Sequence, residues 1–120
     1  MEDLERLCQE MLKYLKGEHV DFSWCKVDLS SFTDFERNVL EQTRKIPYGH
    51  TMTYGELAAV IGRKGASRAV GSALSKNPYP IIIPCHRVIS SNGMGGFCGS
   101  KDSESLSVKR KLLILEGVKI

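Results

Sequence analysis

The sequence predicts a mainly α-helical fold with one short β element, in which a winged-helix-like helix-turn-helix is preceded by an N-terminal helix. Three observations predict it. Apolar residues recur at helical spacing near both ends of the chain. Thr-x-x-Glu capping boxes at Thr33 and Thr53 each precede such a run. A glycine-bounded basic turn, residues 62–65, separates two short helical segments, as a helix-turn-helix requires.

The chain length and the charge distribution limit the domain organisation and the partners. A length of 120 residues suits one domain with one core. We expect residues 1–32 to form a docking helix and an extended connection, and residues 33–120 to form the functional domain. Residues 1–35 carry four Lys/Arg and eight Asp/Glu, whereas residues 36–120 carry thirteen and six. This basic bias favours a polyanionic partner such as nucleic acid, although an ordinary solvated surface explains it equally well.

The first predicted helix docks through one apolar face and ends at Gly17. Residues 18–32 alternate only briefly between apolar and polar, which predicts an extended connection or at most a short strand. The residues of the docking face are Leu4, Leu7, Cys8, Met11, Leu12 and Leu15.

Each capping box is expected to open one helix. The box at Thr33 opens a helix that Pro47 and Gly49 close. The box at Thr53 opens a shorter helix that stops at the glycine turn. The inward residues expected are Phe35, Val39, Leu40 and Thr43 in the first helix, and Leu57, Ala58, Val60 and Ile61 in the second.

The helix predicted after the glycine turn, residues 66–74, has small residues around one long cation, Arg68. Small residues let a helix backbone approach another surface closely. That surface is either a neighbouring helix or the minor groove of DNA, where a protruding side chain can wedge the duplex. The small residues are Ala66, Ser67, Ala69 and Gly71.

A reactive thiol is the main chemical candidate in the sequence. Asn77 and Pro78 predict a turn, and the apolar run 81–83 predicts a strand-like segment that ends at Cys85 beside His86. A neighbouring imidazole can favour the nucleophilic thiolate, although a lone cysteine after three isoleucines is also typical of packing. Adjacent residues of an extended segment point to opposite sides, so a water is expected to bridge Cys85 and His86.

The last part of the chain predicts a loop and a helix. Residues 90–99 are rich in Gly and Ser, which favours a loop able to close over a ligand. A helix is expected over residues 105–116, and Gly117 ends it. Its apolar residues are Leu106, Leu112, Leu113 and Leu115, and its expected exposed cations are Lys109, Arg110 and Lys111.

Cysteine spacing and hydropathy predict an intracellular protein. The cysteines at positions 8, 25, 85 and 98 lack the spacing of a zinc site and the density of a secreted scaffold, so reduced thiols are expected. The acidic N-terminus does not resemble a signal peptide, and no apolar run approaches membrane-spanning length. We expect no membrane partner and no metal.

Several motifs, in order and at near-family spacing, resemble the O6-alkylguanine-DNA alkyltransferase family over roughly residues 33–120. Too few residues precede them for the full N-terminal sheet domain of many members, so the resemblance is to a short form. The motifs are Ile46-Pro47-Tyr48-Gly49, Thr53-Tyr54-Gly55-Glu56-Leu57-Ala58, Ser67-Arg68-Ala69-Val70-Gly71, Asn77-Pro78-Tyr79-Pro80, Ile81-Ile82-Ile83-Pro84-Cys85-His86-Arg87-Val88 and Leu115-Glu116-Gly117.

The resemblance implies DNA repair by direct damage reversal. An alkyl group would pass irreversibly from O6-alkylguanine in double-stranded DNA to Cys85, with O4-alkylthymine as a further candidate substrate. The resemblance implies that Arg68 replaces the extruded nucleotide and that Tyr54 helps rotate it, because the alkylated oxygen is shielded in the stack. It also implies minor-groove binding by a monomer, and no metal or organic cofactor.

The resemblance assigns roles around the cysteine. Cys85, a water, His86 and Glu116 would form a relay, and Asn77 would tie the helix-turn-helix to the reactive segment. The backbone of Cys85 and Val88 would contact the guanine, and Phe97 and Cys98 would form the lid. A disulfide between Cys85 and Cys98 under oxidation is a further hypothesis. The DNA-contacting residues expected are Tyr54, Arg63, Ala66, Ser67, Arg68, Gly71 and Ser91.

Two alternatives remain at the level of sequence. A non-enzymatic alkyltransferase-like protein would share the DNA surface and bind the lesion, but such proteins replace the acceptor cysteine. A thiol hydrolase would use Cys85 and His86 and would regenerate its thiol, with the helix-turn-helix merely structural. Turnover separates the hydrolase from an acceptor that reacts once.

Overall fold

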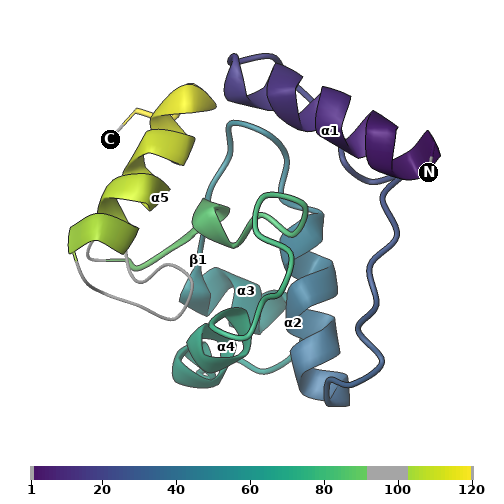
Figure 1. The fold of residues 1–120 in the computed structure, drawn as a ribbon. Helices are drawn as coiled ribbons and strands as arrows, with labels where there is room; N and C mark the ends of the chain where they lie inside the picture. Colours follow the sequence, from purple (N-terminus) through teal and green to yellow (C-terminus); the bar gives the residue numbers. More distant parts are fainter. Residues whose placement is uncertain (1, 92–102, 120) are drawn as a thin grey trace.

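The computed structural model describes residues 2–91 and 103–119 (Figure 1). Two strands of two residues pair in parallel, with Met52 beside Val88, and helices form the rest of the regular structure. The predicted mainly α fold with a short β element is therefore confirmed. The elements are α1 (Glu2–Leu15), α2 (Asp34–Arg44), β1 (Met52–Thr53), α3 (Tyr54–Val60), α4 (Ser67–Leu74), the 3₁₀ helix η1 (Cys85–Arg87), β2 (Val88–Ile89) and α5 (Ser103–Leu115).

Both capping boxes form, and they place the starts of α2 and α3. The Thr33 hydroxyl accepts from the Glu36 N–H at 3.1 Å, and the Glu36 carboxylate accepts from the Thr33 N–H at 3.0 Å. Thr53 and Glu56 repeat this exchange at 3.0 and 2.8 Å. Each box satisfies two N–H groups that a helix start leaves without a partner, so these boundaries follow from local sequence.

Helices α2, α3 and α4 pack on one another, and α1 lies apart from them across the fold (Figure 1). The C-terminal end of α1 lies beside the C-terminal end of α5, whereas the two termini of the chain lie on opposite sides of the molecule (Figure 1). One core joins these parts. It contains Tyr14, Val20, Phe22, Leu29, Val39, Leu40, Ile46, Leu57, Ala58, Val70, Ala73, Leu74, Ile83, Cys85, Val88 and Leu112.

The docking face of α1 differs from the predicted one. Tyr14 is fully buried, and Leu7 and Met11 pack partly buried against the core. The prediction was right for Leu7 and Met11 but passed over Tyr14, because it counted only aliphatic residues and cysteine. Cys8, also predicted on this face, is exposed. The predicted inward residues that are more than half exposed are Leu4, Leu12 and Leu15 in α1, and Val60 in α3.

Two further predictions are wrong. The run 81–83 is not a strand, because Ile81 has φ = 74°, a left-handed conformation that a β-branched residue rarely adopts. The strand β2 instead follows the cysteine, and Pro80 and Ile83 form only an isolated bridge. Lys109, predicted to be exposed on the last helix, is completely buried.

Candidate active site

Cys85 lies on the single turn of η1, which follows Pro84. The Cys85 N–H donates to the Ile83 carbonyl at 2.7 Å, and the Arg87 N–H donates to the Pro84 carbonyl at 2.9 Å. The expectation that the cysteine ends an extended strand is therefore wrong, because the chain tightens into a turn before β2 begins. Cys85 is 6% exposed, so only a small part of its side chain reaches solvent.

The His86 imidazole is fully buried and oriented by Glu116. Its Nε2 lies 2.6 Å from Glu116 Oε2. A carboxylate only accepts, so Nε2 carries the hydrogen of this bond. Burial lowers the pKa of His86, although the Glu116 charge opposes this, and the ring is therefore neutral near pH 7. Nδ1 has no hydrogen-bond partner within the described residues, so its lone pair is the proton acceptor of the ring.

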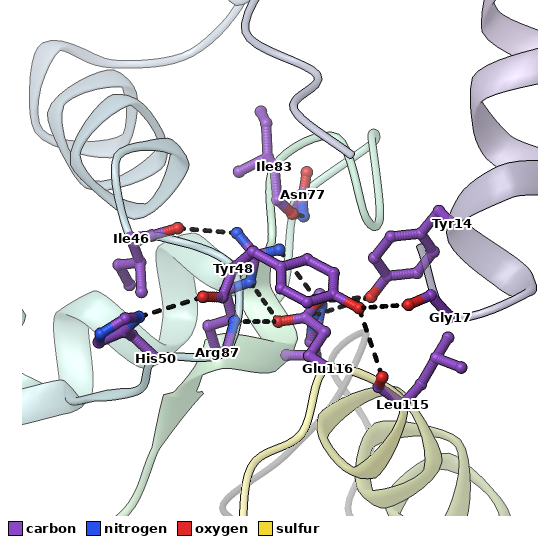
Figure 2. Close-up of polar contacts among 12 residues, drawn as sticks. Tyr14, Gly17, Ile46, Tyr48, His50, Asn77, Ile83, Arg87, Leu115 and Glu116 are labelled. Carbon is purple, nitrogen blue, oxygen red and sulfur yellow. Dashed lines mark hydrogen bonds and ion pairs between the residues drawn. The ribbon is translucent and has the colours of Figure 1, made fainter. Parts of the chain in front are cut away.

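The Glu116 carboxylate is the centre of the network (Figure 2). Its Oε2 accepts from His86, from the Tyr14 hydroxyl at 2.5 Å and from Arg87 Nη2 at 2.9 Å. Its Oε1 accepts from Arg87 Nε at 2.8 Å and from the Gly49 N–H at 3.1 Å. Burial alone would raise the pKa of Glu116, but the bonds from His86, Arg87 and Tyr14 outweigh it and hold this pKa well below its usual range. Glu116 is thus a buried anion.

Gly49 approaches Glu116 at a place where no other residue fits easily. Its φ is 78°, and a Cβ there would lie 3.1 Å from the Glu116 backbone oxygen. A side chain would therefore be strained and would meet the backbone that carries the carboxylate. Gly49 was predicted only to close α2. It also allows the backbone to come close enough for its N–H to donate to Glu116.

Arg87 neutralises the buried anion. It is 7% exposed, and it binds Glu116 through two nitrogens. Its Nη1 donates to the Ile46 carbonyl at 2.7 Å, which fixes the guanidinium to the segment after α2 (Figure 2). A buried charge needs such pairing, and the fork of a guanidinium suits both carboxylate oxygens.

Lys109 brings a second cation to the site from α5. Its Nζ donates to the Val88 carbonyl at 2.7 Å and lies 5.8 Å from the centre of the Tyr54 ring. Burial lowers the pKa of Lys109 to about 8, and a negative charge on Cys85 would oppose this lowering. Lys109 is therefore mostly a cation at pH 7, and its charge would stabilise a Cys85 thiolate.

Asn77 connects the end of α4 with the segment before η1. Its Nδ2 donates to the Ile83 carbonyl at 2.9 Å, and its Oδ1 accepts from the Tyr79 N–H at 2.9 Å. The nitrogen and the oxygen of the side-chain amide each make a hydrogen bond. The position of the reactive turn therefore depends on the position of the end of α4. Figure 2 shows Asn77 beside Ile83.

All but one of the residues predicted to contact DNA lie on α3, on α4 or on the turn between them. Tyr54 begins α3 and is half-buried, and a Cβ on Gly71 would lie 3.9 Å from its ring. Helix α4 begins without a side-chain cap. Ser91 lies apart from this group in the chain, exposed in the turn after β2. Of the others, Arg63, Ser67 and Arg68 are exposed and Ala66 is half-buried.

Two predicted lid residues cannot be placed. Phe97 and Cys98 lie outside the described residues, as does any disulfide between Cys98 and Cys85. Within residues 2–91 and 103–119, no group of three or more His, Cys, Asp or Glu could hold a metal ion. In the same part of the chain, no helix is long and apolar enough to span a membrane.

Sequence reasoning missed four residues of this site. Arg87 and Gly49 lie inside motifs that were noticed, but their contacts with Glu116 have no local signature. Tyr14 and Lys109 are polar-ended residues on helices, and nothing in their neighbourhood marks them as buried. Tyr14 is 102 residues from its partner, so only the folded structure reveals the pair.

Comparison with known proteins shows which family this chain belongs to. A family model described as the DNA-binding domain of 6-O-methylguanine DNA methyltransferase matches residues 34–118. The methylated-DNA–protein-cysteine methyltransferase of Methanothermobacter thermautotrophicus is 40% identical over 118 residues, which cover 98% of this chain and 63% of that protein. This chain spans about half to two thirds of the length of the curated relatives that it matches.

Two solved structures are similar in fold as well as in sequence. The structure of Mycobacterium tuberculosis OGT in complex with DNA has a TM-score of 0.79 and 42% identity, covering 92% of this chain and 65% of that one. The structure of S. pombe Atl1 in complex with damaged DNA containing O6-carboxymethylguanine has a TM-score of 0.60 and 35% identity, covering 72% and 79%.

Proposed function

Because this chain belongs to the 6-O-methylguanine DNA methyltransferase family, we propose that it repairs DNA by accepting the alkyl group of O6-alkylguanine on Cys85. One observation carries the proposal. Cys85 is buried next to His86, whose Nε2 is held by the anion Glu116 and whose Nδ1 has no partner within the described residues. A thiol becomes strongly nucleophilic when a nearby base removes its proton, and a third group commonly orients that base.

The proposed reaction balances without a cofactor. The sulfur of Cys85 attacks the alkyl carbon, and the sulfur–carbon bond forms as the carbon–O6 bond breaks. The thiol proton passes to Nδ1 of His86 through a bridging water, the departing guanine anion takes up one proton from solvent, and the imidazolium releases its proton to solvent. The products are a thioether and unmodified guanine, so each chain reacts once. The charge of Lys109 near Cys85 favours the thiolate.

We propose that the turn between α3 and α4 binds double-stranded DNA through the minor groove. Arg68 is exposed near the start of α4, where it can replace the extruded nucleotide, and Tyr54 contacts the flipped guanine. The uncapped start of α4 carries the positive end of a helix dipole, which favours phosphate. Contacts to the DNA backbone or close approach to it are proposed for Arg63, Ala66, Ser67, Gly71 and Ser91.

The guanine is proposed to contact the carbonyls of Cys85 and Val88 beneath a lid that includes Phe97 and Cys98. The Val88 carbonyl already accepts from Lys109, but an oxygen of this kind has a second lone pair. Action on O4-alkylthymine, a monomeric state, an intracellular location and the division into residues 1–32 and 33–120 remain proposals.

The two alternatives differ from this proposal in measurable ways. A lesion binder would hold O6-alkylguanine DNA without changing it. The similarity to S. pombe Atl1 keeps this hypothesis open, but Cys85 supplies the acceptor that such a protein lacks. A thiol hydrolase would release its product and regenerate the thiol.

Incubation with duplex DNA containing O6-methylguanine, followed by intact-mass and peptide analysis, tests the proposal. We expect one added methyl group per chain, on Cys85, with unmodified guanine restored in the DNA. The Cys85→Ala variant should bind the duplex and transfer nothing, whereas Cys8→Ala, which changes an exposed thiol on α1, should react like the wild type. Lesion binding by folded wild-type protein without modification of Cys85 would refute the proposal, and repeated turnover would favour the hydrolase.

A further inference from the structure

We propose that Tyr14 of α1 is a positioning residue for the alkyl transfer, acting through Glu116 on the His86 base. This inference rests on the proposed function of Cys85. It extends the reactive centre to a helix that lies outside the residues matched by the family model, 34–118. The N-terminal helix thus supplies a functional group in addition to packing.

The Tyr14 hydroxyl binds the same carboxylate oxygen as the His86 imidazole. The Tyr14 hydroxyl donates to Glu116 Oε2 at 2.5 Å (Figure 2). It also lies 3.4 Å from His86 Nε2. It therefore shares one carboxylate oxygen with the imidazole that this oxygen orients. A donor at this place limits where Oε2 can lie, and so limits the rotation of the imidazole.

The Tyr14 ring is held firmly enough to act in this way. The side chain is completely buried. Its ring packs edge to face against Phe22, with centroids 6.1 Å apart, and against Tyr48, with centroids 6.0 Å apart. Two such contacts from different segments fix both the direction of the ring and the position of the hydroxyl.

The Tyr14 hydroxyl also affects how strongly Glu116 stabilises the protonated form of His86. Burial raises the pKa of Tyr14, and the bond to Glu116 raises it further, so the phenol remains a donor. Each donor on Oε2 reduces the negative charge that would stabilise a protonated imidazole. Tyr14 therefore helps keep His86 neutral, with Nδ1 able to accept the thiol proton.

No other described group near the carboxylate duplicates this role. Arg87 binds the same oxygen as a permanent cation, and Lys109 acts on His86 only through its charge. The Tyr48 hydroxyl instead donates to the backbone carbonyls of Leu115 and Gly17, at 3.3 and 3.4 Å. Tyr48 is thus a matched control in the same aromatic cluster.

The test compares Tyr14→Phe with Tyr48→Phe, since both substitutions keep the ring and remove one hydroxyl. Single-turnover methyl transfer from O6-methylguanine duplex is measured from pH 5.5 to 9. For Tyr14→Phe the midpoint of the acidic limb should move up by about one unit, because His86 protonates more easily. The rate should fall roughly threefold or more at pH 6 and stay within about twofold at pH 8.5. The profile of Tyr48→Phe should match the wild type.

A second measurement separates this inference from the proposed function. The ¹⁵N resonances of the His86 ring, followed by NMR against pH in the free protein, should show a higher pKa in Tyr14→Phe than in Tyr48→Phe. If the wild type transfers no methyl group, the proposed function fails, and the NMR titration still decides on Tyr14. An unchanged His86 titration, or a rate loss that is uniform across pH, overturns the role of Tyr14.

Discussion

The relay around Glu116 and the helix pair α3–α4 hold their key residues in opposite ways. His86 and Glu116 are buried, and Glu116 accepts hydrogen bonds from four residues in three segments of the chain. Arg68 and Ser67 are exposed at the start of α4, which has no side-chain cap. The relay groups are hydrogen-bonded to one another without a substrate, whereas the exposed side chains of the helix pair are available for new contacts.

This difference suits two different proposed roles, proton acceptance and DNA binding. A base that must accept a proton at one atom benefits from dipoles and charges that are already in place, since nothing has to reorganise during the reaction. A surface that meets a long polyanion benefits from exposed cations with several rotamers, since the ligand completes the geometry. We therefore expect substitutions in the relay to affect stability and chemistry together, and substitutions on the helix pair to affect DNA processing alone.

The largest effect is expected from Glu116→Gln, which removes the anion of the relay. Arg87 would then be a buried cation without its partner, and loss of one partner of a buried pair costs about 3 kcal/mol of unfolding free energy. Methyl transfer should also fall strongly, because His86 loses the group that orients it. Chemical denaturation and single-turnover kinetics measure the two losses.

The pH dependence of this stability loss has a definite sign. The folded-state pKa of Glu116 lies below its usual value of 4.5, so its contribution is fully present above that value and is lost as pH falls toward the folded pKa. The difference between wild type and Glu116→Gln should therefore be constant near pH 7 and shrink below about pH 4.5. Glu41→Gln, an exposed acid on α2, is the control. An equal loss in both variants would contradict a special role for the relay.

The same contrast explains how much of the molecule could be predicted from sequence. The starts of α2 and α3 were predictable, because each depends on a threonine and a glutamate three residues apart. The exposure of Arg68 was also predictable, since small residues around one long cation leave it no partner on its own helix. These signals come from residues close together in the chain, so they can be read from one sequence.

The relay was only partly predictable, because its bonds join distant segments. Glu116 was linked to His86 only by the family resemblance. Lys109 was predicted on the wrong side of α5, since a charged residue in a helical pattern is usually solvated and its reach to the Val88 carbonyl leaves no trace in the pattern. The prediction of a strand-like segment before Cys85 was wrong, because Ile81 has a left-handed backbone conformation that interrupts an extended chain.

The second effect in size is expected from Arg68→Ala on the exposed side of the comparison. If Arg68 replaces the flipped nucleotide, methyl transfer from duplex DNA should slow by roughly tenfold, which corresponds to about 1.4 kcal/mol. The reaction with free O6-benzylguanine needs no flipping, so its rate should stay within about twofold. The unfolding free energy should not change, because the side chain is exposed.

The control for Arg68→Ala is Lys64→Ala, which removes an exposed positive charge from the neighbouring turn. Loss of charge alone should weaken duplex binding in both variants and make it less sensitive to salt. Only Arg68→Ala should slow transfer when the DNA concentration is saturating. Equal slowing of both variants at saturation, or equal loss on free base and duplex, would show that Arg68 does not act in flipping.

The smallest effect is expected where the two regions meet, at Asn77. Asn77→Ala removes the bond to the Ile83 carbonyl and the bond from the Tyr79 N–H, at a cost of about 1 kcal/mol in unfolding free energy. Because those bonds tie the end of α4 to the turn that carries Cys85, transfer from duplex DNA should fall more than the reaction with free O6-benzylguanine. Ser75→Ala, which removes only a local bond to the Ser72 carbonyl, should leave the ratio of the two rates unchanged. A ratio that is also unchanged in Asn77→Ala would mean that the buried relay and the exposed helix pair act independently.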